Sequence, residues 1–392
     1  MSNEEKEKQS LQLRTFGTSS GQALSQGRIM SIDALRGFDM FWIIGGWSIF
    51  RGLHEKFDNS TTQWLTRQMS HVKWEGFTPW DLIMPLFLFV VGVVMPFAFN
   101  KRLELGHSKS RLYRHIIMRF VILFILGMIA QGRLLEYDLS QLRIFSNTLQ
   151  AIAVGYVISA VIILNLKLVW QLITTGALLL LFWALMMLIP VPGHGAGVLT
   201  PEGNLAIYID RLVLGSFIDG TDPPYTWILS GMTFTCTVML GVFAGHLLRS
   251  KKSNSRKVLL LAAMGIGSLL LGWIWNDRLW IFSFPIIKHL WTSSFVLYSA
   301  GWCFLLLALF YLVIDVLGLK KWAFPFVVIG MNAIAVYMAT HVFNFRHIGD
   351  IFVGGLEKWC GPWNGFIQAV AAFAVIWLIL LWMYRKKTFI KI

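Results

Sequence analysis

Charged residues are scarce in this chain, and their scarcity excludes most soluble folds. Only 14% of the 392 residues are Asp, Glu, Lys or Arg, whereas 56% are hydrophobic and the mean hydropathy is +0.63. One soluble core could not hide that much apolar surface. Lipid is the solvent that accepts the excess, so the composition predicts an integral membrane protein.

The chain also has few cysteines, and we find no signal peptide and no internal repeat in it. The three cysteines, Cys236, Cys303 and Cys360, do not have the spacing of a disulfide framework or of a metal site, and we expect no metal,. Residues 1–28 are polar and lack the apolar run of a signal peptide, so we expect a disordered cytoplasmic tail. We find no repeat of fixed period, and we expect residues 29–392 to form a single transmembrane domain.

Long apolar runs fill the rest of the chain. A helix crosses a hydrocarbon core of about 30 Å with about 20 residues, because it rises about 1.5 Å per residue. The sequence therefore predicts an all-α bundle of about ten spans, with a range of about nine to eleven. The expected spans lie near 37–52, 79–98, 115–131, 148–165, 169–190, 228–248, 258–276, 290–315, 323–340 and 364–383. The first of them is the weakest by hydropathy.

The net charge of +14 reports topology and not nucleic-acid binding. Lys and Arg lie in short loops between the spans and form no basic face, so we expect no nucleic-acid partner. When the loops are assigned to alternate sides, 23 of the 34 Lys and Arg residues fall on the side of the N-terminus. The positive-inside rule then places both termini in the cytoplasm.

The segment HVKWEGFTPWD, residues 71–81, holds the strongest candidates for chemistry, at the point where the chain re-enters the membrane. His71 could act as a general base or as a nucleophile, since imidazole titrates near neutral pH; the alternative is a hydrogen-bonded surface group. Asp81 could orient His71 or hold a substrate hydroxyl or amine, or it could only stabilise the helix start after Pro79. Trp74 could be no more than an interfacial anchor.

Asp33 and Arg36 form a second candidate site, before the first span. Three positions apart, they share one helical face, where they could form an ion pair of modest worth. Arg36 could instead bind an anionic cofactor at the cytoplasmic mouth, because a guanidinium group matches phosphate in a forked geometry. The sequence leaves both possibilities open.

Further polar residues mark the outer half of the bundle. Asn332 lies in an apolar segment and either bonds another helix or lines a substrate path, with His341 nine residues on,. Lys288 and Trp291 form an outer-edge cluster, for which snorkelling and interfacial anchoring are the alternatives, and Lys288 could also lose its proton or pair with an acid. The long outer loop 191–227 should end in a short helix near 204–214.

Six collinear blocks resemble the heparan-α-glucosaminide N-acetyltransferase family, from about residue 28 to the C-terminus. The blocks are RIMSIDALRG, HVKWEGFTPWDLIMPLFLFVVG, LIPVPGHGAGVLTPEGNLAIYIDRLVLG, HLWTSSFV, GMNAIAVYMATHVF and YRKKTFIKI. In that family the active-site histidine precedes the D-L-x-x-P helix start, a position that His71 holds here. The resemblance implies a homodimer in a bacterial inner membrane. It also implies acetyl-CoA as the donor, the amine of a glucosamine-type sugar as the acceptor, and delivery of the acetyl group across the bilayer.

The resemblance also suggests roles for the other candidates. Trp74 and Trp291 would stack on the sugar, with Lys288, Asn332 and His341 beside it. On the inner side, Arg36 and Asp33 would hold the cofactor.

Two departures limit the resemblance. The extra luminal domain and preceding span of the lysosomal enzyme are expected to be absent. The family stretch R-I-P-G-V-L-Q-R appears as RIFSNTLQA, residues 143–151, so Arg143 and Gln150 persist as candidate cofactor contacts while the second arginine is lost. An amino-sugar transporter without acetyl transfer is the rival function; internal two-fold symmetry would favour it, and we detect none.

Overall fold

A computed structural model describes residues 29–57, 59–277 and 282–390, and the predicted tail over residues 1–28 lies outside this described part. The helices are α2 (Met30–Phe41), α3 (Trp47–Lys56), α4 (Ser60–Gln68), α5 (Ile83–Glu104), α6 (Lys109–Ala130), α7 (Thr148–Asn165), α8 (Leu168–Leu188), α9 (Leu205–Leu214), α10 (Gly231–Arg249), α11 (Asn254–Asn276), α12 (Ser293–Phe310), α13 (Phe324–Gly330), α14 (Ala333–Val342), α15 (Phe345–Val353), α16 (Glu357–Cys360) and α17 (Asn364–Arg385). The short α9 confirms the helix predicted near 204–214.

The predicted polytopic helical bundle is confirmed. Eight helices of the described part are long and apolar enough to cross a membrane, and a bent pair gives a ninth if it is one span. The segment predicted at 37–52 is not among them. It lies in a helical stretch formed by α2, the π-helical residues Trp42–Gly46 and α3, where the charges of Asp39 and Arg51 interrupt the apolar run.

The bent pair corrects the single helix predicted at 323–340. The helical stretch Lys321–Gly330 meets Ala333–Val342 at an angle of 62°. The break falls at Asn332, whose side-chain amide donates to the carbonyl of Thr388 at 3.2 Å and accepts from the N–H of Ile390 at 3.0 Å. The polar group predicted in this apolar segment therefore fixes the C-terminal segment against the break.

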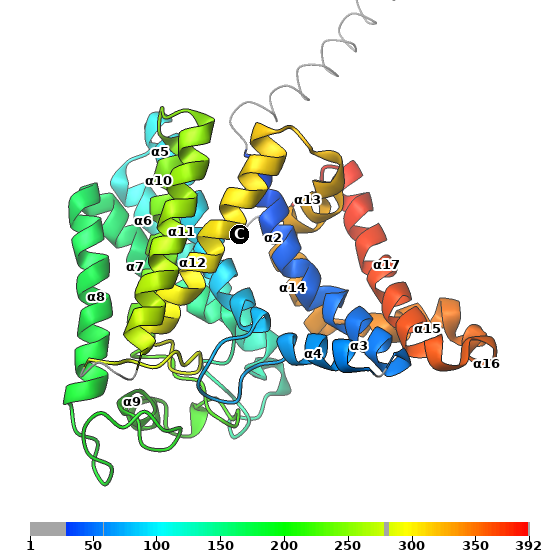
Figure 1. Cartoon of the computed structure of the whole chain (residues 1–392), viewed down its shortest axis with the longest axis horizontal. Helices are drawn as coiled ribbons and strands as arrows, with labels where there is room; N and C mark the ends of the chain where they lie inside the picture. The colour runs from blue at the N-terminus through cyan, green and yellow to red at the C-terminus, as the bar shows by residue number, and fades with distance from the viewer. Residues whose placement is uncertain (1–28, 58, 278–281, 391–392) are drawn as a thin grey trace, which may run out of the picture.

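Burial separates a central layer of helices from a peripheral one. Within the most apolar window of each span, 78% of the α10 span and 61% of the span that contains α5 are buried, against 17% for α11. Peripheral helices therefore present apolar side chains outward, as expected where lipid covers them. In Figure 1, α5 to α8 and α10 to α12 form one group, and α2, α13, α14 and α17 form the other.

Close backbone contact joins α2 to α13 within the second group. A Cβ atom on Gly37 would lie 1.7 Å from the carbonyl oxygen of Phe326, and one on Gly330 would lie 2.0 Å from that of Asp33. Only glycine permits this approach. The contact brings the start of α2 beside the bend between α13 and α14, and both elements line the inner cavity described below.

The loops divide between the two ends of the bundle. Figure 1 shows α9 and the loops around it at the opposite end from the turn between α10 and α11, and α3, α4, α15 and α16 lie near the α9 end. The loop that carries residues 71–78 belongs to the α9 end as well, because the N–H of Gly76 donates to the carbonyl of Ile286 at 2.9 Å. We call this the outer end, following the orientation that the basic loops predict.

Candidate functional site

Asp81 stands where the chain turns from an outer loop into α5, and its two oxygen atoms have different partners. Oδ2 accepts a hydrogen bond from the backbone N–H of Thr78 at 3.1 Å, at a helix start opened by Pro79. Oδ1 lies 2.7 Å from Nδ1 of His71. Asp81 therefore stabilises the helix start and contacts His71 at the same time, so the two predicted alternatives occur together.

Lys288 joins His71 and Asp81 in a cluster of three that we name the outer cluster. Its Nζ atom lies 3.3 Å from Oδ1 of Asp81 and 3.1 Å from Nδ1 of His71. Although 217 positions separate Lys288 from His71, the hydrogen bond between Gly76 and Ile286 ties their two loops together. The predicted pairing of Lys288 with an acid is confirmed.

The members of the outer cluster differ in exposure. The side chains of Asp81 and Lys288 are 1% and 7% exposed, whereas that of His71 is 45% exposed. Burial lowers the pKa of Lys288 to about 8, against the opposing attraction of the Asp81 carboxylate,. Lys288 is therefore mostly a cation at neutral pH. Since Nδ1 of His71 faces these buried groups, Nε2 is the ring nitrogen that a substrate can approach.

A stack of three rings borders the outer cluster. The ring of His289 lies between those of Trp74 and Tyr225, with centroid distances of 5.4 and 4.3 Å. Trp74 also donates from Nε1 to the carbonyl of Leu199 at 2.9 Å. Burial, followed by the charge of Lys288, lowers the pKa of His289 to about 4, so this ring is neutral at physiological pH,. One face of Trp74 is covered, and only its other face could contact a sugar.

The ring of Trp291 lies in the protein core, although its backbone N–H donates to the carbonyl of Lys288 at 3.0 Å. Its ring is 1% exposed and packs against Phe234 and Phe295, each with a centroid distance of 5.0 Å. Its Nε1 donates to Oγ1 of Thr237 at 3.0 Å. The predicted stacking of Trp291 on a sugar does not fit this placement, because a ring packed among aromatic neighbours offers no face to a ligand.

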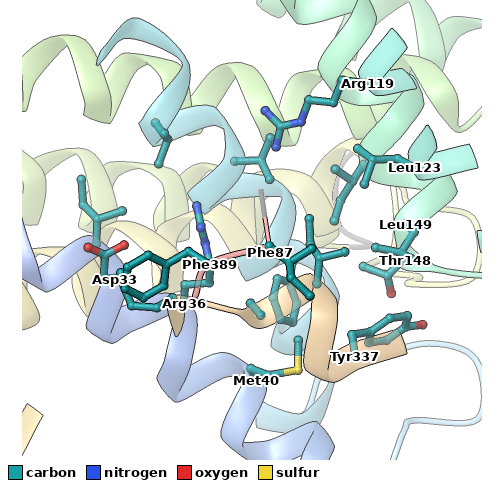
Figure 2. A pocket seen from close by; sticks show the side chains of 18 of the residues that line it. Asp33, Arg36, Met40, Phe87, Arg119, Leu123, Thr148, Leu149, Tyr337 and Phe389 are labelled. Carbon is teal, nitrogen blue, oxygen red and sulfur yellow. The ribbon is translucent and has the colours of Figure 1, made fainter. Parts of the chain in front are cut away.

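A cavity of about 340 Å³, which we name the inner cavity, lies between α2, α5, α6, α7 and the bent pair α13–α14. Most of its lining is apolar, and its polar lining residues are Asp33, Arg36, Arg119, Thr148 and Tyr337. Figure 2 shows Arg36 and Arg119 on different walls, with their guanidinium groups directed into the space between them. Nε of Arg119 is buried and has no hydrogen-bond partner within the described residues. The Asp33–Arg36 pair therefore belongs to a cavity that can take an anionic ligand.

A second cavity, of about 670 Å³, lies at the outer end of α14, and we name it the outer cavity. Its lining is more polar than that of the inner cavity and includes Arg143, Asp219 and His341. Nη1 of Arg143 donates to the carbonyls of Leu142 and Ser216, both at 3.1 Å. Burial raises the pKa of Asp219, and its hydrogen bonds and the charge of Arg143 oppose that rise. The predicted cofactor contact Arg143 thus lies with the predicted substrate contact His341.

Tyr337, His341 and Tyr225 connect these features. Tyr337 lines the inner cavity and His341 the outer one, and Nδ1 of His341 lies 2.8 Å from the carbonyl oxygen of Tyr337. Burial, followed by the charges of Asp81 and Asp219, raises the pKa of the Tyr225 phenol. The Tyr225 ring stacks on His289, and its backbone N–H donates at 3.4 Å to Oγ1 of Thr221, which lines the outer cavity. Tyr225 therefore links the outer cluster to the outer cavity.

Gln150 and Asn332 have structural partners. Oε1 of Gln150 accepts from the backbone N–H of Ser146 at 2.7 Å, at the start of α7. Asn332 holds the C-terminal segment, as described above, and is 1% exposed. Neither residue lines the inner or the outer cavity. Their contacts with cofactor or substrate stay predictions.

Four residues near these spaces are not among the candidates predicted from the sequence. Arg119 lies in the predicted span 115–131, and a cation within an apolar run is a signal that could have found it. Tyr337 belongs to one of the quoted blocks and lies one helical turn before the predicted contact His341, a signal that could have found it. Tyr225 and Asp219 carry no signal, because only the packing of the loop after α9 brings them to the site. Asp210 on α9 orders that loop by accepting from the N–H of Trp227 at 2.7 Å.

Two curated proteins are similar to this chain. It is 29% identical over 377 residues to the heparan-α-glucosaminide N-acetyltransferase of Homo sapiens and 28% identical over 377 residues to that of Mus musculus. The similarity covers 82% of this chain, but the chain spans about half the length of these relatives, 55% and 56%. The chain matches no protein-family model. The comparisons confirm the resemblance predicted from the six sequence blocks.

Proposed function

We propose that this chain is a membrane acetyltransferase that moves an acetyl group from acetyl-CoA to the amine of a glucosamine-type sugar. The observation that carries the proposal is the 2.7 Å contact between Nδ1 of His71 and Oδ1 of Asp81. A buried carboxylate beside Nδ1 favours the tautomer with its proton on that nitrogen, which leaves a lone pair on Nε2. Both curated relatives are named as N-acetyltransferases, which supports the same activity.

The transfer forms a carbon–nitrogen bond and breaks the carbon–sulfur bond of the thioester. In one route, Nε2 of His71 attacks the acetyl carbon, CoA leaves as the thiolate, and the sugar amine then takes the acetyl group from the imidazole. In the other route, Nε2 removes a proton from the amine while the amine attacks the thioester directly. In both routes the sulfur leaves as thiolate and ends as the free thiol of CoA. The proton lost by the amine passes through His71.

The donor occupies the inner cavity. Arg36 and Arg119 offer two guanidinium groups for the phosphates of acetyl-CoA, and Nε of Arg119 is a buried donor that such a ligand would satisfy,. The apolar part of the lining suits the pantetheine arm. The concentration of Lys and Arg on the side of the N-terminus supports cytoplasmic termini, so acetyl-CoA enters from the cytoplasm,.

The acceptor approaches through the outer cavity. Its polar lining suits a sugar, whose hydroxyls need hydrogen-bond partners, and Asp219 offers a buried carboxylate for the amine or a hydroxyl,. Trp74 has one ring face that is not covered by His289. The acetyl group then crosses from the inner to the outer side through the region of Tyr337 and His341. The homodimer and the bacterial inner membrane are also part of the proposal, supported by the resemblance.

The test uses the full chain, purified in detergent and supplied with acetyl-CoA and glucosamine. We expect free CoA thiol and N-acetylglucosamine to appear in equal amounts. His71→Ala should lower the rate by about 10²-fold or more, the range of general acid–base catalysis. His54→Ala is the matched control, because His54 lies on α3 near the outer end, where its Nδ1 lies 3.1 Å from Oγ1 of Thr62 and outside the outer cluster. It should keep the rate of the unaltered chain.

Two outcomes would contradict the proposal. One is free CoA that never appears, and the other is an equal rate with His71→Ala. Uptake of glucosamine into proteoliposomes without acetyl-CoA would support the transporter instead. Acid-quenched protein that carries labelled acetyl on His71 would select the route through an acetyl-imidazole.

A further inference from the structure

The three close contacts of the outer cluster cannot all be hydrogen bonds when Nδ1 of His71 carries a proton. Nδ1 of His71 lies 2.7 Å from Oδ1 of Asp81 and 3.1 Å from Nζ of Lys288, while Nζ lies 3.3 Å from the same Oδ1. If Nδ1 carries a proton, it donates to Asp81 and cannot accept from the ammonium group. Lys288 then donates to Asp81, and its positive charge stands beside the imidazole without a hydrogen bond to it.

We propose that Lys288 is a positioning residue that keeps His71 neutral, with its proton on Nδ1 and its lone pair on Nε2. The inference rests on the proposed function for its consequence, since only a neutral imidazole can attack a thioester or remove a proton from an amine. It departs from the predicted role of Lys288 as a ligand of the substrate. Lys288 acts on His71 and on the carboxylate, and it does not touch the reacting atoms.

Electrostatics supports this role. Asp81 alone would favour the imidazolium form of His71, because an opposite charge at this distance stabilises the cation. The ammonium group of Lys288 lies 3.1 Å from Nδ1 and has the same charge as an imidazolium, so it opposes that effect. Lys288 is only 7% exposed, which limits screening by solvent,. With a pKa of about 8, Lys288 is mostly charged at neutral pH.

Other titratable groups near His71 do not replace this effect. His289 is neutral, because burial lowers its pKa to about 4. Burial and two carboxylates raise the pKa of Tyr225, so its phenol is neutral as well. Asp81 of the α5 start and Lys288 of the loop before α12 contact His71, and the charge of His71 acts on His289. Tyr225 of the loop before α10 stacks on His289, with Asp219 beyond it, and Lys73 and Glu75 belong to the loop of His71 itself. Lys73 and Glu75 are exposed, so water screens their charges,.

The first test measures the protonation of His71 without any substrate. Diethyl pyrocarbonate modifies neutral imidazole, and mass spectrometry of the His71 peptide gives the rate across a pH series. Lys288→Met should raise the midpoint of this pH dependence by about one unit or more, the usual effect of one nearby charge. Lys288→Arg keeps the charge and should leave the midpoint within about 0.3 unit. Lys73→Met, in the same loop as His71, is the matched control and should not move it.

The second test records CoA release from acetyl-CoA and glucosamine over the same pH series. We expect the acid limb of the pH profile of kcat to move to higher pH with Lys288→Met and to stay in place with Lys288→Arg. A Lys288→Met chain whose midpoint is unchanged or lowered would overturn the inference. So would a rise in the KM of glucosamine with an unmoved acid limb, because that pattern belongs to a substrate ligand.

The modification assay also separates the inference from the proposed function. If His71→Ala keeps full activity while Lys288→Met still moves the modification midpoint, the proposed function fails and the inference on His71 stands. If His71→Ala is inactive and the midpoint does not move, the inference alone fails. Should Lys288→Met not fold, Lys288→Gln supplies the same loss of charge with a polar side chain.

Discussion

The inner cavity and the outer cluster differ in how they use charge. The inner cavity encloses about 340 Å³, its lining is mostly apolar, and its arginines come from different helices. In the outer cluster, three charged or titratable groups lie within 3.3 Å of one another, and two of them are almost completely buried. The first arrangement leaves room for a ligand and one buried donor, Nε of Arg119, without a hydrogen-bond partner within the described residues. The second has its groups already paired and suits the control of one proton.

Under the proposed function, this difference separates binding of the donor from the chemistry of transfer along the membrane normal. Substitutions in the inner cavity should change the affinity for the donor, whereas substitutions in the outer cluster should change the rate of the chemical step. Three substitutions test this division, in addition to those at His71 and Lys288.

Asp81→Asn should have the largest effect. It removes the charge that pairs with Lys288 and lets the amide present either an oxygen or an N–H to Nδ1 of His71, so kcat should fall by about 10²-fold or more. A buried Lys288 without its counter-charge should also destabilise the fold, by about 3–5 kcal/mol. Kinetics and thermal unfolding in detergent measure both effects.

The double variant Asp81→Asn with Lys288→Met separates these two effects. Removing the unpaired charge should recover part of the lost stability without recovering kcat. Asp138→Asn, in an exposed outer loop, is the control and should leave both quantities unchanged. Wild-type kcat in Asp81→Asn would show that the carboxylate serves only the helix start.

Arg119→Gln should weaken the binding of the acetyl donor by about tenfold, because one charge-assisted hydrogen bond contributes about 1.5–3 kcal/mol. The Kd of CoA, measured by titration calorimetry in detergent, should rise, and kcat at saturating acetyl-CoA should stay within about twofold. Arg111→Gln lies on the same helix, is exposed, and does not line the cavity, so it should not change the Kd. A fall in kcat with no change in Kd would break the proposed division.

Asp219→Asn should have the smallest effect, a rise of a few-fold in the KM of glucosamine with the KM of acetyl-CoA unchanged. Because burial raises the pKa of Asp219, its carboxylate is present above that raised pKa and is lost as the pH falls through it,. The difference in KM between Asp219→Asn and the unaltered chain should therefore shrink on acidification, and at a higher pH than for an ordinary aspartate. Equal KM values at all pH values would remove the outer cavity from the acceptor path.

Local sequence was enough to predict most of the helices and two of the three members of the outer cluster, His71 and Asp81. A span is read from an apolar run, and α9 from the turn residues before it, because both depend on neighbours in sequence. The bend at Asn332 could not be predicted, since its amide bonds to the backbone of Thr388 and Ile390, far along the chain. The sequence places Trp291 in an outer-edge cluster with Lys288, whereas the packing of α10 and α12 buries its ring in the core.

The sequence by itself determined that this protein is a helical membrane bundle and that His71 and Asp81 lie on either side of a helix start. The length of the apolar runs decides the first point. The second follows because His71 and Asp81 are only ten positions apart, on either side of Pro79. Only the tertiary structure decided that Lys288 completes the outer cluster and that Arg119 faces Arg36 across the inner cavity. Contacts between segments so far apart depend on how the helices and outer loops pack, and no local pattern of residues records that packing.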